Sequence, residues 1–127
     1  MTVEHLSDYQ VSEEQIQAYH REGFLLIEDF FSPEEHLELI SICNEIANWP
    51  DQKNKWMQYY ERNTETGEKQ LCRTENFTPF HDRMREYVRG PRVVNLLAKL
   101  NNGSEYVLFK EKINYKLAGG GGKWRFF

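Results

Sequence analysis

The chain has 127 residues and a net charge of −4, which fits one acidic globular domain large enough to bury a hydrophobic core. Nucleic acids and anionic membranes favour a basic protein face, so the composition argues against both as main partners. No stretch approaches the roughly 20 apolar residues of a membrane span, and the opening MTVEHLSDYQ lacks the basic start and apolar core of a secretory signal. We therefore expect a soluble cytoplasmic protein, with an organelle lumen left open.

Two helices and one strand are predicted in the first forty-eight residues. VSEEQ at 11–15 has the spacing of a capping box and predicts a helix over 12–22, which a glycine then ends. SPEE at 32–35 places a proline at the first helical position, and apolar residues at helical spacing extend this helix to about residue 48. Between them, FLLI at 24–27 is a short apolar run that we interpret as a buried strand.

The middle of the chain alternates between strand and helix signals. Aromatic residues over 55–61 predict a strand, NTETG at 63–67 is typical of a hairpin turn, and 69–73 would be the returning strand. A Thr-Pro pair begins a helix predicted over 78–89, which Gly-Pro ends. A further helix is predicted over 93–100, where Asn-Asn-Gly follows.

The segment 106–117 has a clear period of two. Its odd positions carry Val107, Phe109, Ile113, Tyr115 and Leu117, and its even positions carry Lys110, Lys112, Asn114 and Lys116. This alternation predicts one long strand with two different faces. If the odd side chains pack against the N-terminal helices, the even ones must face the opposite side of the sheet.

Helices followed by few strands indicate an α+β fold with an incomplete sheet. A thin sheet leaves strand edges unpaired and one apolar face uncovered. We therefore expect self-association through the exposed strand.

The sequence contains no complete catalytic or metal-binding constellation. His36 and Glu38 lie two apart on a predicted helix, where their side chains point away from each other. His20 is expected at a helix end, where an imidazole meets the negative end of the helix dipole. Cys43 and Cys72 lack metal or redox spacing and are interpreted as reduced, packed thiols. We assign no catalytic residue and no metal ligand.

Two stretches resemble the phytanoyl-CoA dioxygenase family. VSEEQIQAYHREGFLLIEDFFSPEEHLELI, at 11–40, resembles its opening helix, its glycine-bounded "GF" strand and its "SPEE" helix. LFKEKINYKLAGGGG, at 108–122, resembles the strand and glycine turn that precede the His-x-Asp half of its iron site. On this resemblance, 11–122 is the N-terminal part of such a domain, 1–10 is a flexible N-terminus, and 123–127 is a divergent tail.

The resemblance implies an Fe(II)- and 2-oxoglutarate-dependent dioxygenase on a double-stranded β-helix, or jelly roll, that hydroxylates a small organic or acyl substrate. Because the family's His-x-Asp pair and distal histidine are missing from the 127 residues, the chain itself is expected to hold no iron or 2-oxoglutarate and to be inactive. The resemblance places cosubstrate contacts near Lys112, with Asn114 and Lys116 on the same face, and a further basic contact near Arg73. The simpler interpretation of these four residues is a solvated strand face and a surface charge.

Two functions therefore stay open. The chain is either the N-terminal part of an oxygenase that acts only at full length, or a non-catalytic short isoform with a binding or regulatory role. A Pro-His-Gln-Asp-like stretch in the continuing reading frame would favour the first.

Overall fold

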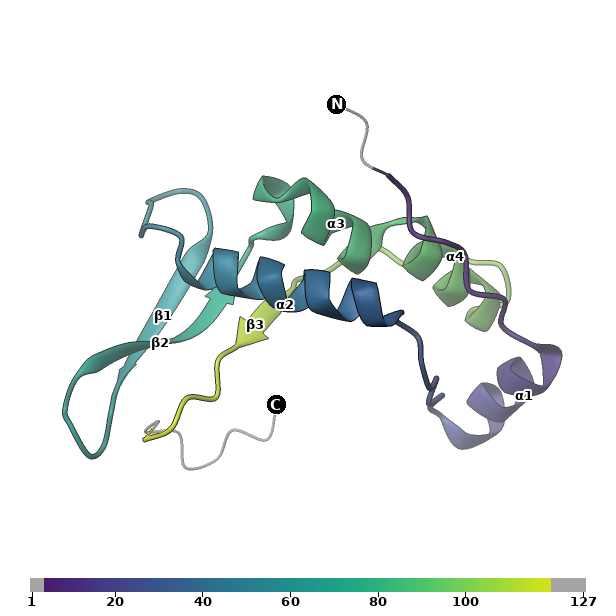
Figure 1. The fold of residues 1–127 in the computed structure, drawn as a ribbon. Coiled ribbons are helices and arrows are strands. Elements are labelled where there is room, and N and C mark those ends of the chain that lie inside the picture. Colours follow the sequence, from purple (N-terminus) through teal and green to yellow (C-terminus); the bar gives the residue numbers. More distant parts are fainter. Residues whose placement is uncertain (1–3, 120–127) are drawn as a thin grey trace. The chain divides into compact units, whose positions relative to one another are not determined.

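The computed structural model describes residues 4–119. Its elements in chain order are α1 (Glu13–Glu22), α2 (Pro33–Ala47), β1 (Met57–Arg62), β2 (Lys69–Glu75), the 3-10 helix η1 (Thr78–Phe80), α3 (Asp82–Arg89), α4 (Pro91–Leu100) and β3 (Lys112–Asn114) (Figure 1). They divide between two compact units. Of the described residues, the helical unit contains 4–39 and 81–109, and the sheet unit contains 40–80 and 110–119.

Helix α1 begins and ends where the sequence predicted. The Ser12 hydroxyl accepts a hydrogen bond from the backbone N–H of Gln15, while the Gln15 side chain accepts one from the backbone N–H of Ser12. Gly23 ends the helix at φ 85°, a left-handed conformation that glycine adopts without strain. His20 lies in the last turn, as expected.

The buried strand predicted over 24–27 is wrong. This segment has no ladder partner, and the side chains of Phe24 and Leu26 are 66% and 75% exposed. A strand needs a neighbour to satisfy its backbone groups, and within the described residues all three strands belong to the sheet unit, while 24–27 belongs to the helical unit. The apolar run is therefore part of an irregular connection between α1 and α2.

Arg92 on α4 is the centre of the helical unit. Its guanidinium makes a bidentate ion pair with Glu35 on α2, at 2.7 Å from Nη2 to Oε2 and 3.1 Å from Nη1 to Oε1. Its Nε donates to the carbonyl of Ser7 and its Nη1 to the carbonyl of Phe30. One buried side chain thereby joins α4 to α2, to the N-terminal segment and to the connection before α2.

Glu35 also completes the N-terminal cap of α2. Its carboxylate accepts a hydrogen bond from the Ser32 backbone N–H at 2.9 Å, and its own N–H donates to the Ser32 hydroxyl at 3.1 Å. This is a second capping box, with Pro33 at the first helical position as the sequence indicated. The same carboxylate thus begins a helix and anchors Arg92.

The described part of the N-terminal segment, predicted as flexible over 1–10, makes specific contacts with α3. Leu6 is buried, and its backbone N–H donates to the Glu86 carboxylate at 3.0 Å. The His5 ring nitrogen Nδ1 lies 3.1 Å from the same carboxylate. These contacts satisfy a glutamate that would otherwise be costly to bury.

Three polar side chains, Glu38 of α2 with Arg83 and Tyr87 of α3, join the two helices. Glu38 accepts hydrogen bonds from the Tyr87 hydroxyl and, at 2.9 Å, from Arg83 Nε. Burial and the neighbouring carboxylate raise the pKa of Tyr87 to about 12, so its hydroxyl remains a donor at physiological pH.

Two predicted helix boundaries differ from the structure. The helix predicted from residue 78 is divided into η1 and α3, because the His81 ring accepts a hydrogen bond from the Met84 N–H and thereby caps a new helix. Helix α4 begins at Pro91 instead of residue 93, since proline suits the first helical position.

In the sheet unit, β2 lies between β1 and β3 in an antiparallel sheet of order β1-β2-β3 (Figure 1). The predicted hairpin is confirmed. The buried residues of this unit come from the second half of α2, from β2 and from the segment that follows it: Ile42, Ile46, Cys72, Thr74, Phe77 and Thr78. Cys43 is half-buried, and both cysteines are free thiols. Burial raises the pKa of the Cys43 thiol, which favours its protonated form.

The long strand predicted over 106–117 is also wrong in its length. The ladder contains only Lys112 to Asn114, opposite Glu75 to Arg73, and one further bond joins the Tyr115 N–H to the Cys72 carbonyl. Val107 and Phe109 are 89% and 91% exposed and do not pack in the core as predicted. Alternating apolar and polar residues indicate a segment that could present one apolar and one polar face as a strand. A strand forms, however, only where another backbone pairs with it.

The mixture of helices with a three-stranded antiparallel sheet confirms the α+β class. Three strands do not define a jelly roll, so that architecture stays a prediction. Within residues 4–119, no helix is long and apolar enough to cross a membrane.

Replacing Glu35 should make stability depend less on pH. The hydrogen bonds from Arg92 lower the pKa of the Glu35 carboxyl below its ordinary 4.5. The stabilisation is therefore complete above the unfolded-state pKa and is lost as the pH falls through the lower folded-state pKa. We expect Glu35→Gln to lose about 1.5–3 kcal/mol at pH 7 in urea unfolding, with the difference from wild type narrowing towards pH 3. Glu34→Gln, in the same turn and exposed, is the control; an equal effect would contradict the role of Glu35.

The exposed apolar residues before β3 should promote self-association. Val107 and Phe109 present apolar surface of the kind that soluble monomers usually cover. Light scattering after size exclusion should show the wild-type chain associating with increasing concentration and the double variant V107S/F109S associating less. A wild-type chain that stays monomeric at about 100 µM would contradict this expectation.

Candidate anion-binding face of the sheet

The sheet register brings two of the predicted site residues directly opposite each other. Arg73 on β2 pairs with Asn114 on β3 and, on its other side, with Tyr59 on β1. The next row contains Met57, Glu75 and Lys112. Because residues opposite one another project from the same face, Arg73, Asn114 and Lys112 share one face of the sheet.

Lys116 lies two residues beyond β3 and is exposed. Its place in the alternation matches Lys112 and Asn114, but no ladder pair fixes it.

The opposite face belongs to the core. Thr74 is fully buried, and it pairs with Ile113, which is half-buried. The Tyr115 hydroxyl donates to the Thr74 hydroxyl at 3.1 Å. Burial raises the pKa of Tyr115, with a further contribution from Cys43 of α2. Within β3 and Tyr115, the odd residues therefore face the core, as the alternation predicted, and Lys112 and Asn114 face away from it.

Arg73 is held by two neighbours on this face. Its guanidinium carbon lies 4.1 Å from the centre of the Tyr59 ring, a cation–π contact. Its Nε is buried and lies 3.1 Å from Oε1 of Glu75, an ion pair that lacks the geometry of a hydrogen bond. A register shift between Tyr59 and Tyr60 interrupts the ladder just beside this pair. Bulges of this kind often redirect side chains near functional sites.

Sequence reasoning missed Tyr59 and Glu75. The Arg-x-Glu spacing within β2 could have indicated that Arg73 and Glu75 share a face. Tyr59 gave no such signal, because its position depends on the register between two strands.

The charges of this face favour an anion. Arg73 and Lys112 carry positive charge on this face, and Lys116 follows two residues beyond β3, whereas Glu75 supplies a carboxylate; the whole chain is acidic. Opposite charges attract more strongly at a partly buried surface than in bulk water. We interpret this anion-binding face, defined by Arg73, Lys112, Asn114 and Lys116, as suited to a ligand with carboxylate or phosphonate groups.

Residues 4–119 contain no group of three His, Cys, Asp or Glu side chains placed to hold a metal ion. The described residues therefore do not fit an iron site, and we derive no catalytic step from them. His81 caps α3, and His5 contacts Glu86.

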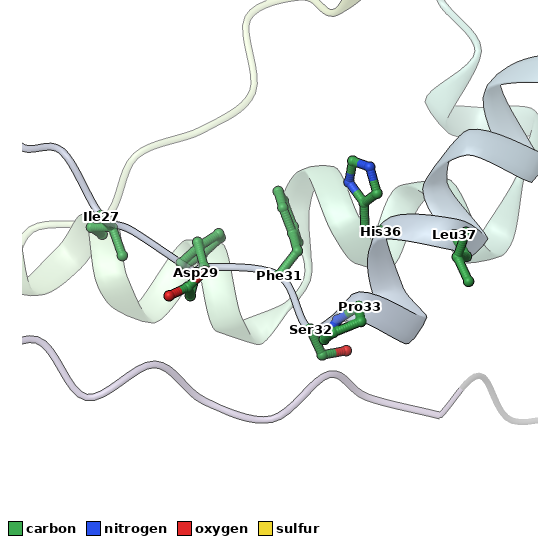
Figure 2. Close-up of a pocket in the computed structure, with 8 residues that line it drawn as sticks. Ile27, Asp29, Phe31, Ser32, Pro33, His36 and Leu37 are labelled. Atoms are coloured by element: carbon green, nitrogen blue, oxygen red, sulfur yellow. The ribbon is translucent and has the colours of Figure 1, made fainter.

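The helical unit has an open pocket of about 960 Å³ at the start of α2. Figure 2 shows Ile27, Asp29 and Phe31 from the connection between α1 and α2, and Ser32, Pro33, His36 and Leu37 from the cap and first turns of the helix. Its lining is mainly apolar, with Asp29 and His36 as its titratable side chains. These two do not form a recognisable catalytic pair, so we regard the sheet face as the stronger candidate site.

Fold and site together define an α+β protein with a cationic sheet face. Its sequence is similar to three oxygenases. It is 33% identical to 2-aminoethylphosphonate dioxygenase of the uncultured bacterium HF130_AEPn_1 over 87% of the chain. It is 32% identical to methylphosphonate hydroxylase of Gimesia maris and 34% identical to dioxygenase lolE1 of Epichloe uncinata, each over 88% of the chain.

The chain spans 42–43% of the length of these relatives. No family model matches the sequence, and no solved structure matches it. The likeness therefore covers nearly all of this chain and less than half of each relative. It supports the resemblance to oxygenases, but it does not establish the activity of a full-length protein.

The chain is expected to hold no 2-oxoglutarate as a resident cofactor, but the anion-binding face should still attract the dianion weakly, through charge. Without a metal to hold its keto acid end, the dianion should bind the 127-residue chain with a Kd of about 1–10 mM, which a titration followed by NMR can measure. Arg73→Ala should weaken binding about tenfold, and binding should also weaken as salt is added. Lys53→Ala, an exposed cation on the loop before β1, is the control. Equal effects of the two variants would indicate unspecific attraction.

Proposed function

We propose that these 127 residues supply the N-terminal part of a non-haem Fe(II)- and 2-oxoglutarate-dependent dioxygenase of the phytanoyl-CoA dioxygenase family. The observation that carries the proposal is the similarity to three oxygenases over 87–88% of the chain. The cationic sheet face supports it, because 2-oxoglutarate is a dianion that such a face would bind.

The proposal gives the residues of the sheet face separate roles. Arg73, whose planar guanidinium can donate two parallel hydrogen bonds, binds one carboxylate of 2-oxoglutarate. Lys112 and Lys116 add positive charge nearby, and Asn114, opposite Arg73, provides an amide for a hydrogen bond. Iron would be held by residues outside the described part of the chain.

The proposed substrate is a small organic anion. The names of two relatives specify 2-aminoethylphosphonate and methylphosphonate, and phosphonates are therefore the first substrates to assay. An acyl substrate, which the family resemblance implies, is the second class to assay.

Sequencing the transcript and the flanking reading frame comes first. The proposal expects a His-x-Asp pair soon after the glycine turn and a distal histidine further on. A frame that continues to the length of the relatives without these ligands would overturn it. A reading frame that ends at residue 127, in a transcript found in cells, would instead favour the non-catalytic short isoform.

An assay of succinate formation should distinguish the 127-residue chain from a longer protein expressed from the continuing reading frame. A protein expressed from the continuing frame should form succinate from 2-oxoglutarate when iron, oxygen and substrate are present. The 127-residue chain should neither retain stoichiometric iron after gel filtration nor form succinate above a control without protein, because at least three ligands are needed for this chemistry. Iron retained by the short chain would show that its ligands had been misidentified.

A further inference from the structure

Arg73 is constrained on two sides by Tyr59 and Glu75, two residues to which the proposed function gives no role. The Tyr59 ring covers one face of the guanidinium, and Glu75 contacts its Nε. Within residues 4–119, the two terminal nitrogens of Arg73 make no hydrogen bond and no ion pair. Of the guanidinium nitrogens, Nη1 and Nη2 are therefore the two that the described residues leave to a ligand.

Such constraint matters because arginine is a flexible side chain. Binding an anion with a mobile guanidinium requires ordering several torsion angles, and this cost reduces affinity. A guanidinium already stacked on a ring and paired at Nε has lost much of that freedom before the ligand arrives. The Nε atom is itself buried, so a ligand carboxylate cannot bind across Nε and one terminal nitrogen.

We propose that Tyr59 and Glu75 are positioning residues that hold Arg73 so that Nη1 and Nη2 receive one carboxylate of 2-oxoglutarate end-on. This inference rests on the proposed function, in which Arg73 contacts the cosubstrate. It adds two residues from β1 and β2 that determine how well that contact is made.

The first test uses the Arg73 Nε–Hε signal in NMR spectra of the 127-residue chain, without any ligand. The stacked and paired guanidinium should give a distinct signal, shifted by the Tyr59 ring. Tyr59→Leu should move this signal towards that of a mobile arginine, whereas Tyr59→Phe, which keeps the ring, should preserve most of the shift.

The same variants are then titrated with 2-oxoglutarate. Tyr59→Leu should raise the Kd about two- to fivefold, the effect of one exposed cation–π contact, and Tyr59→Phe should stay within about twofold of wild type. Tyr60→Leu is the matched control, because Tyr60 is the next residue of β1 and its ring lies 4.2 Å from the Lys69 ammonium instead of Arg73. Amide spectra of each variant check that the sheet is intact.

Glu75 provides a test in which the two interpretations predict opposite changes in the affinity for 2-oxoglutarate. If Glu75 were only a nearby negative charge, Glu75→Ala would strengthen the binding of a dianion. If it positions Arg73, the variant weakens binding despite removing that repulsion. Stronger binding by Glu75→Ala would overturn its role.

The outcomes separate this inference from the proposed function. Absence of 2-oxoglutarate binding by the wild-type chain, or binding unaffected by Arg73→Ala, would contradict the cosubstrate role of the face. Binding that requires Arg73 but is unaffected by Tyr59→Leu, with an unchanged Nε–Hε signal, would overturn only the positioning of Arg73 by Tyr59.

Discussion

The bidentate pair between Arg92 and Glu35 is the contact on which the helical unit depends. A guanidinium buried this deeply is tolerated only where its hydrogen bonds are satisfied, and Arg92 donates to Glu35, Ser7 and Phe30. Two of these acceptors are backbone carbonyls in segments that have no helix or strand of their own. The ion pair thus orders chain segments that have little regular hydrogen bonding to stabilise them.

The sheet unit depends in a similar way on β2. Its alternate residues serve two purposes, since Cys72 and Thr74 are buried while Arg73 and Glu75 occupy the other face. Shifting the strand by one residue would bury a charged pair and expose the core. The packing of one face consequently determines which side chains the other face can offer to a ligand.

The oxygenase similarity and the sheet face support each other through different observations. The similarity extends over nearly the whole chain, but it assigns no role to any individual residue. The register, by contrast, places Arg73 beside Asn114, although the two residues are far apart in the sequence. A cationic face on an otherwise acidic protein is easier to explain by an anionic ligand than by chance, because like charges gathered together repel each other.

The sequence by itself determined the features that depend on local chemistry. Ser12 and Gln15 predicted the start of α1, Pro33 that of α2, and the alternation around Ile113 the face of β3 that meets the core. These succeeded because capping and side-chain alternation involve residues within a few positions of one another.

Tertiary structure decided the features that require a partner far away in the sequence, namely strand pairing and contacts between strands. The segments 24–27 and 106–111 have strand-like sequences but no strand partner in the described residues, so they form no strand. Their apolar side chains Phe24, Leu26, Val107 and Phe109 are exposed. The contact of Tyr59 with Arg73 depends on a register that no single strand encodes. A strand is completed by its neighbour's backbone, whereas a helix satisfies most of its hydrogen bonds within itself, and this difference explains why the helices could be predicted more closely than the strands.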